Sequence, residues 1–151
     1  MEGIKALSTG TKLVLAAGPL LFFSLFFTWQ TPVIDYGRAG RAEALLDGWD
    51  FWGLLIGLVT LTLVTLVVIA QLTEVEMSPD VPWDLLTLGL GVVAFPLALV
   101  KNLTDADSAW ASYVGVLLAT AVALGAYEMW AETTDRPSVL GRFRRGVSST
   151  A

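Results

Sequence analysis

Hydrophobic residues gather in four long runs along the chain. The runs cover residues 13–29, 51–72, 85–100 and 109–130, and Glu128 is the only charged residue inside them. A helix needs about 20 mostly apolar residues to cross roughly 30 Å of hydrocarbon. The pattern therefore predicts membrane-spanning helices at about residues 12–29, 51–72, 83–101 and 109–130. Because the runs are apolar on every side, they do not fit a water-soluble amphipathic bundle.

These spans define an all-α fold class, an integral membrane four-helix bundle with both termini cytoplasmic. Residues 1–135 are expected to form one transmembrane domain, and residues 136–151 a basic cytoplasmic tail. No internal repeat, low-complexity tract or second domain is evident between the runs.

Composition removes most kinds of chemistry from consideration. Hydrophobic residues make up 55% of the 151 positions and charged residues 15%, whereas soluble domains carry roughly a quarter charged residues. The absence of cysteine and histidine excludes disulfides and thiolate sites, and it removes the commonest general base and transition-metal ligand. A net charge of −5 disfavours nucleic-acid binding. We therefore predict no enzyme activity, no catalytic or metal site, no cofactor and no nucleic-acid partner.

Every tryptophan lies at an end of an apolar run. The indole ring prefers the headgroup level of a bilayer, where it is surrounded by apolar atoms while its N–H still reaches water. We interpret all six as interface anchors: Trp29, Trp49, Trp52, Trp83, Trp110 and Trp130.

Small residues repeat at four-residue spacing on two of the predicted helices. The second helix begins with the pair Gly53 and Gly57. The fourth helix carries a longer stripe, made of Ala111, Gly115, Ala119 and Ala123. Helices in lipid associate through close packing rather than the hydrophobic effect. We therefore expect these two stripes to make the tightest helix contacts.

Polar residues near the helix ends are expected to cap the helices. Their side-chain oxygens can accept hydrogen bonds from the free N–H groups of a first helical turn. The predicted caps are Ser8, Thr9, Asp50, Asp80, Asp105, Asp107 and Ser108. Cation binding by the loop carboxylates is the alternative.

Two charged residues close to the spans are expected to lie at opposite membrane borders. Glu128 is interpreted as a solvated carboxylate near the inner end of the fourth helix. Lys101 is expected at the outer border, so the two residues are too far apart to pair within one chain.

The longest connection covers residues 30–49. Its charged residues alternate with alanine and leucine in a way that suits a short surface helix: Arg38, Arg41, Ala42, Glu43, Ala44, Leu45, Leu46 and Asp47. Such a segment could bind a partner or cover the bundle, and it is too short to form an independent domain.

Basic residues are distributed unequally between the two sides of the predicted bundle. With both termini in the cytoplasm, that side holds six lysines and arginines, and the opposite side holds three. The positive-inside rule therefore favours this orientation. The tail supplies most of the difference, and three of its arginines are predicted to contact anionic lipid: Arg142, Arg144 and Arg145. A disordered tail that only sets the topology is the alternative.

Three segments, at residues 7–12 (LSTGTK), 26–29 (FFTW) and 48–52 (GWDFW), resemble small four-helix membrane proteins of high-GC Gram-positive bacteria. That group has no assigned function. The resemblance covers the first third of the chain by motif and the remainder by hydropathy. It implies a multi-pass protein of a bacterial plasma membrane, and it transfers no catalytic or binding residue.

Two functions fit these observations. The first is a non-enzymatic membrane protein, an accessory or scaffold subunit, that acts through contacts with another membrane protein or with itself. The alternative is a small transporter or channel formed by oligomerisation, with hydroxyl groups and glycine backbone lining the pore.

Overall fold

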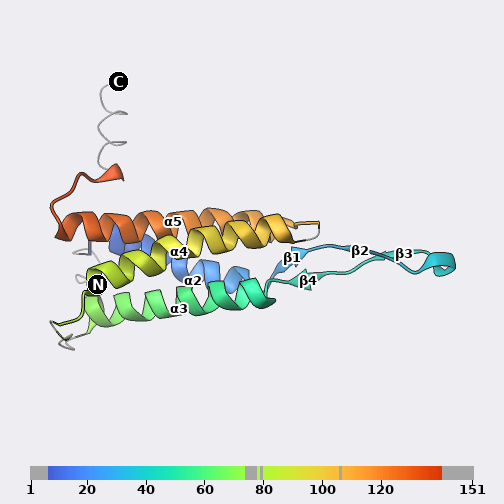
Figure 1. Ribbon diagram of the computed structural model, residues 1–151, viewed down its shortest axis with the longest axis horizontal. Helices are drawn as coiled ribbons and strands as arrows, with labels where there is room; N and C mark the ends of the chain where they lie inside the picture. Colours follow the sequence, from blue (N-terminus) through green and yellow to red (C-terminus); the bar gives the residue numbers. More distant parts are fainter. Residues whose placement is uncertain (1–6, 74–77, 79, 106, 141–151) are drawn as a thin grey trace, which may run out of the picture.

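The computed structural model describes residues 7–73, 78, 80–105 and 107–140. Its four helices run up and down in a bundle (Figure 1): α2 (Thr9–Ser24), α3 (Phe51–Leu72), α4 (Trp83–Thr104) and α5 (Trp110–Thr133). The segment between α2 and α3 contains short strands and one 3-10 turn: β1 (Thr28–Gln30), β2 (Val33–Asp35), η1 (Gly37–Ala39), β3 (Arg41–Glu43) and β4 (Leu46–Asp47).

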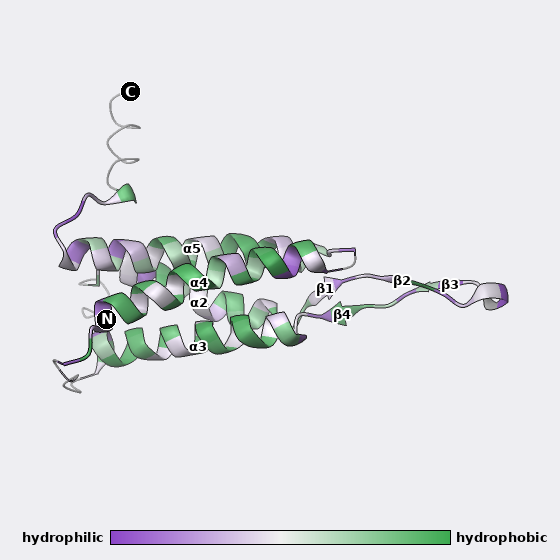
Figure 2. Ribbon diagram, viewed as in Figure 1, coloured by the Kyte–Doolittle hydropathy of each residue, from purple (hydrophilic) through white to green (hydrophobic). Residues whose placement is uncertain are grey.

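The helices form a closed ring in which α2 and α4 each pack against both α3 and α5. Every helix contributes fully buried apolar side chains to one core, including Leu21, Leu63, Ala98 and Val122. Apolar residues also cover much of the outer surface of the helices (Figure 2). An outer surface of this kind is solvated better by lipid than by water.

Three of the four predicted spans have the length and composition of membrane-crossing helices. These are α3, α4 and α5, with 22, 22 and 24 residues. The fourth, α2, has only 16 residues, which gives a length of about 24 Å against the roughly 30 Å of a hydrocarbon core. The predicted span 12–29 is therefore too long, because the chain leaves the helix after Ser24 and enters β1 at Thr28.

Helix capping was predicted correctly for two helices and incorrectly for two. The N–H of Thr11 donates to Ser8 Oγ at the start of α2, and the N–H of Gly53 donates to Asp50 Oδ1 at the start of α3. The residues that precede α4 and α5 are Pro82 and Ala109, and neither makes a side-chain cap. Four predicted caps of these helices are therefore wrong: Asp80, Asp105, Asp107 and Ser108.

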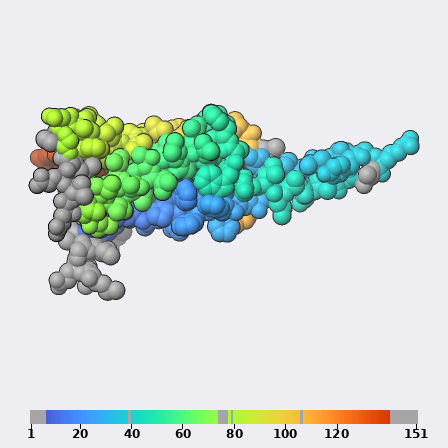
Figure 3. Space-filling model, turned by 90° about the horizontal axis from the view of Figure 1, so that it is seen from below, coloured from blue at the N-terminus to red at the C-terminus, as the bar shows by residue number. Residues whose placement is uncertain are grey.

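The connection between α2 and α3 is an extended β ribbon, so the predicted surface helix is wrong. β1 pairs with β4 at the base of the ribbon, and β2 pairs with β3 near its tip, both antiparallel. Gly37 and Gly40 have positive φ angles of 64° and 100°, which glycine adopts without steric cost. They reverse the chain, so the backbone pairs across the ribbon instead of forming helical hydrogen bonds. The ribbon continues along the long axis of the molecule as a slender arm (Figure 3).

Most residues of the two predicted stripes are buried, and their glycines have different neighbours on the two helices. Gly53 lies against the backbone of Gly48 in the incoming loop. Gly57 faces the ring of Trp49, and a Cβ there would lie 3.0 Å from two ring carbons. On α5, Gly115 faces Trp29, Ala111 and Ala119 are fully buried, and Ala123 is half-buried. The three glycines of the stripes therefore lie against aromatic rings and a loop. Close helix contacts at the alanines stay a prediction.

Two helix backbones also approach each other closely at Gly10 of α2 and Gly125 of α5. A Cβ added to Gly10 would lie 2.7 Å from Gly125 O, and one added to Gly125 would lie 2.9 Å from Gly10 O. This contact also places the start of α2 beside the last turns of α5. Both ends of the helical domain consequently lie at the same end of the bundle, opposite the ribbon (Figure 1).

We expect Gly125→Ala to destabilise the bundle by about 1–3 kcal/mol, because the new methyl group meets backbone atoms that cannot move freely. Gly89→Ala is the matched control, since a Cβ at this α4 position has nothing within 4 Å. Alanine there should leave stability unchanged or raise it by up to about 1 kcal/mol. Thermal unfolding in mild detergent measures both effects. Equal melting temperatures for the two variants would contradict the close contact.

Candidate functional site

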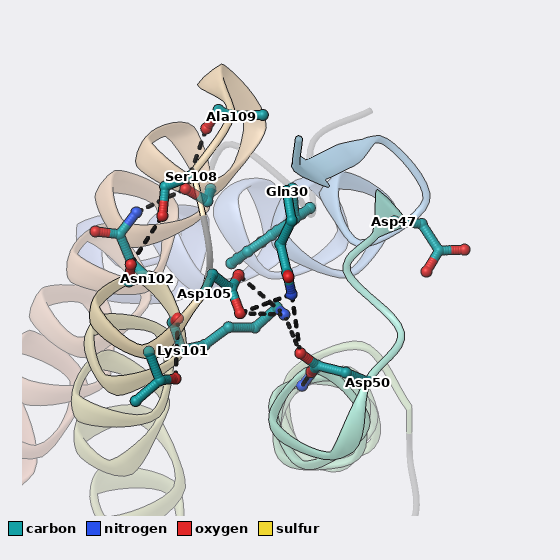
Figure 4. A network of polar contacts seen from close by, with 12 residues as sticks. Gln30, Asp47, Asp50, Lys101, Asn102, Asp105, Ser108 and Ala109 are labelled. Atoms are coloured by element: carbon teal, nitrogen blue, oxygen red, sulfur yellow. Dashed lines mark hydrogen bonds and ion pairs between the residues drawn. The ribbon is translucent and has the colours of Figure 1, made fainter. Parts of the chain in front are cut away.

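A buried lysine lies where the ribbon joins the bundle. Lys101, in the last turn of α4, has 0% exposure. Its Nζ lies 2.6 Å from Asp50 Oδ2 and 3.1 Å from Asp105 Oδ2. Asp50 precedes α3 and Asp105 follows α4, so this ammonium connects the ends of two helices (Figure 4). Lys101 is thus at the end of its span, as predicted, but it points into the protein and not toward a membrane surface.

The ribbon joins the same cluster through Gln30 of β1. Gln30 Nε2 lies 2.8 Å from Asp105 Oδ1 and 3.3 Å from Asp50 Oδ2, and it donates to both. Asp50 also caps α3 with its other oxygen. We call these four residues, Gln30, Asp50, Lys101 and Asp105, the ion-pair cluster. It connects β1, α3 and α4 through side chains alone.

Trp29 forms the inner wall of the ion-pair cluster, so its predicted role as an interface anchor is wrong. The side chain is fully buried, and its ring packs on Gly115 of α5. Its Nε1 donates to Ser24 O over 2.7 Å, and Lys101 Nζ lies 5.2 Å from the ring centroid. A cation near the face of an indole is attracted by the ring quadrupole. Trp29 therefore helps to hold the buried ammonium and does not face the headgroups.

Backbone hydrogen bonds attach β1 to the loop between α4 and α5. The N–H of Thr31 donates to Asp107 O at 2.9 Å, and the N–H of Ala109 donates to Trp29 O at 2.7 Å. β1 is consequently paired on one side with β4 and on the other with this loop. Two side-chain bonds brace the loop itself: Ser108 Oγ donates to Asn102 O, and Asn102 Nδ2 donates to Ser112 Oγ.

The ion-pair cluster contains one positive and two negative groups when all three are ionised. Burial raises the pKa of the Asp105 carboxyl above its ordinary value, and the nearby Asp50 charge acts in the same direction. The hydrogen bond and the positive charge of Lys101 oppose this rise. Within the described ranges, no three acidic residues lie close enough together to hold a metal ion. The contacts of the cluster are therefore suited to anchoring the ribbon.

Beyond its base, the ribbon is paired in a regular antiparallel register. Val33 lies opposite Glu43, Ile34 opposite Ala42, and Asp35 opposite Arg41. The pairing extends by one residue pair at each end. The N–H of Ala44 donates to Pro32 O, and the N–H of Tyr36 donates to Gly40 O.

This register gives the ribbon two chemically different faces. Opposed residues in an antiparallel pair share a face, and successive residues alternate between faces. The apolar face carries Pro32, Ile34, Tyr36, Gly40, Ala42 and Ala44. The charged face carries Val33, Asp35, Arg41 and Glu43, with an ion pair of 3.1 Å between Arg41 Nε and Asp35 Oδ2. Ile34 and Tyr36 on the apolar face are 42% and 58% exposed.

The other predicted anchors lie at the two ends of the bundle. Trp49, Trp52 and Trp110 are at the ribbon end, and Trp83 and Trp130 are at the opposite end. Trp110 is largely exposed, and the other four are half-buried. Their contact with lipid headgroups stays a prediction. The arginines predicted to bind anionic lipid, Arg142, Arg144 and Arg145, lie outside the described residues.

Glu128 is buried and not solvated, which corrects another prediction. Its side chain points inward from α5, the residue is 2% exposed, and Oε1 accepts a hydrogen bond of 2.8 Å from the N–H of Leu140. Glu128 therefore binds the segment that follows α5 back onto the bundle. It lies at the opposite end from Lys101, so the predicted separation of these two residues is correct.

Comparison of the chain with protein-family models, with curated proteins and with solved structures finds no match.

The raised pKa of Asp105 predicts a specific pH dependence of stability. The folded protein retains the Asp105 proton to a higher pH than the unfolded chain, so the contribution of this group to stability falls as pH rises through the raised pKa. Asp105→Asn abolishes this titration. Relative to the parent, its melting temperature should therefore increase as the pH is raised from about 4 to about 8. The control is Asp80→Asn, at the exposed loop of the opposite end. A constant difference between Asp105→Asn and the parent would contradict the assignment.

Proposed function

We propose that this chain is a non-enzymatic membrane protein that acts through protein–protein contacts, and that the β ribbon is its contact element. The observation that carries the proposal is the exposed apolar face at the end of an arm that the ion-pair cluster fixes to the bundle. A two-stranded ribbon on its own is only marginally stable in water. A partner that covers this face would stabilise the ribbon and bury its apolar side chains.

The orientation of the protein follows from the same proposal. With both termini in the cytoplasm, the ribbon extends on the outer side of a plasma membrane. The excess of lysine and arginine on the terminal side supports this arrangement. The resemblance to small membrane proteins of high-GC Gram-positive bacteria supports the choice of membrane. Attraction of the three tail arginines to anionic lipid would add a second contact on the inner side.

The alternative, a transporter or channel, is less well supported within one copy of the bundle. A hollow of about 130 Å3 opens among the four helices at the terminal end, lined in part by Thr11, Gln71, Asp84 and Thr87. Below it the described interior is filled by buried side chains such as Val14, Leu63 and Val122. A pore would therefore have to form between copies and not through one.

The apolar and charged faces provide a direct test of the proposal. A photo-crosslinking residue placed at Ile34 should form covalent adducts with protein in native membranes, because this position points to the contact surface. The same residue at Val33, the adjacent position on the charged face, is the matched control and should yield far less adduct. The products are resolved by electrophoresis and identified by mass spectrometry. Absence of protein adducts at Ile34, or equal yields at the two positions, would contradict the proposed function.

A further inference from the structure

The ribbon not only presents an apolar face but also distributes large and small residues unequally across it. Resting on the proposed function, we infer that the partner of this face is a second copy of the same chain. The two ribbons pack face to face about a twofold axis parallel to their strands. Three independent features of the described residues lead to this arrangement: symmetry, size matching and charge.

Symmetry restricts how two copies in one membrane can meet. If both are inserted in the same direction, the twofold axis that relates them must run along the membrane normal. The ribbon continues along the long axis of the bundle (Figure 1), so its strands run close to that direction. A twofold axis parallel to the strands keeps equivalent residues of the two copies at the same distance from the membrane. It also places β2 of one copy opposite β3 of the second copy.

The side chains on the apolar face match this operation in size. The large residues Pro32, Ile34 and Tyr36 all belong to one strand, and their cross-strand neighbours Ala44, Ala42 and Gly40 are small. Under the twofold axis, Ile34 of one copy faces Ala42 of the second copy, and Ala42 faces Ile34. The same exchange pairs Tyr36 with Gly40 and Pro32 with Ala44. Each large side chain therefore meets a small one, as interdigitating faces of packed sheets require.

The distribution of charge also favours packing through the apolar face over packing through the charged face. All charged side chains of β2 and β3, namely Asp35, Arg41 and Glu43, lie on the opposite side and stay in water. The proposed interface consequently buries no charged side chain of β2 or β3. Packing through the charged face about the same axis would bury all three charges, and Glu43 would face Val33 of the second copy without an opposite charge.

The size of the interface predicts its strength. A standard stable interface uses about 20–30 residues a side, whereas the apolar face contains six. Ribbon packing alone therefore gives a weak dimer. The dimer nevertheless forms in a membrane, because the bilayer confines the two copies to one plane and aligns their ribbons.

Energy transfer between copies tests the inference with the purified full-length protein in liposomes. Donor and acceptor dyes are attached at Ser78→Cys, which is a unique thiol in this cysteine-free chain and lies at the end opposite the ribbon. The parent protein should show transfer above that of an unrelated membrane protein at equal density. Ile34→Asp and Ala42→Lys should each weaken the dimer by about tenfold or more, since each buries an unpaired charge. Val33→Asp, on the charged face, should leave it unchanged.

A mixture of the Ile34→Asp and Ala42→Lys variants tests the facing pairs directly. A dimer of one Ile34→Asp copy with one Ala42→Lys copy places the two new charges opposite each other and keeps the other facing pair native. Transfer in this mixture should therefore recover, although each variant alone shows little. Circular dichroism of every variant checks that the helices remain folded.

Each remaining outcome contradicts the inference in a distinguishable way. A dimer that no ribbon variant weakens forms through the helices. A dimer that Val33→Asp weakens equally, or that the mixture does not restore, does not have the proposed packing. If the parent is monomeric in liposomes while Ile34 still crosslinks a different protein in native membranes, the second copy is the wrong partner and the proposed function stands. If both experiments fail, both conclusions are wrong.

Discussion

The buried ammonium of Lys101 is the interaction on which the arrangement of this protein depends. Removing a charged group from water costs several kcal/mol, and the cost is recovered only with well-placed opposite charges and hydrogen bonds. Lys101 obtains them from Asp50 and Asp105, which lie next to the ends of α3 and α4, and from the ring of Trp29. A buried pair of this kind is weak evidence for stability. Because the Lys101 ammonium needs both carboxylates within contact distance, it nevertheless fixes where the start of α3 and the end of α4 meet.

The ion-pair cluster also determines the direction in which the ribbon leaves the bundle. Gln30 donates to both carboxylates of the ion-pair cluster, and the backbone around it pairs with the loop between α4 and α5. A hairpin attached only through its two chain connections could pivot about the bundle. One attached through Gln30 and the backbone of β1 has a defined exit angle. Packing of two ribbons about a twofold axis requires that angle, because the strands must run close to the bundle axis.

The bundle itself was largely predictable, and the ion-pair cluster was not. The second apolar run coincides with α3, and Asp50 was correctly identified as its cap. Lys101 and Asp105 are four residues apart, a spacing that brings side chains together on a helix, so half of the cluster had a sequence signal. Asp50 lies 51 positions away from Lys101, and no periodicity reports a contact over that separation. Trp29 was misplaced because its position at the end of an apolar run resembles that of the exposed Trp110.

The ribbon did have a local signal, which the composition of residues 42–46 obscured. Alanine, glutamate and leucine favour helices, yet Gly37 and Gly40 follow a segment with the β-branched pair Val33 and Ile34 and precede residues 41–44, in which charged residues alternate with alanine. Such alternation around a glycine turn is characteristic of a hairpin. Tertiary pairing therefore overrode the helical propensity of five residues. The close contact of Gly10 with Gly125 was also missed, since nothing in either local sequence distinguishes these glycines from Gly89.

The ion-pair cluster is expected to hold the ribbon in one direction relative to the bundle. Spin labels at Arg38→Cys, on the ribbon tip, and at Leu117→Cys, on the outer surface of α5, allow their separation to be measured by pulsed electron resonance in liposomes. An excess of unlabelled protein restricts the signal to pairs within one chain. We predict a narrow distance distribution in this background, a broad one after Lys101→Met or Gln30→Leu, and no broadening after Lys12→Met at the opposite end. A distribution that stays equally narrow in both cluster variants, with the helices still folded, would contradict the account.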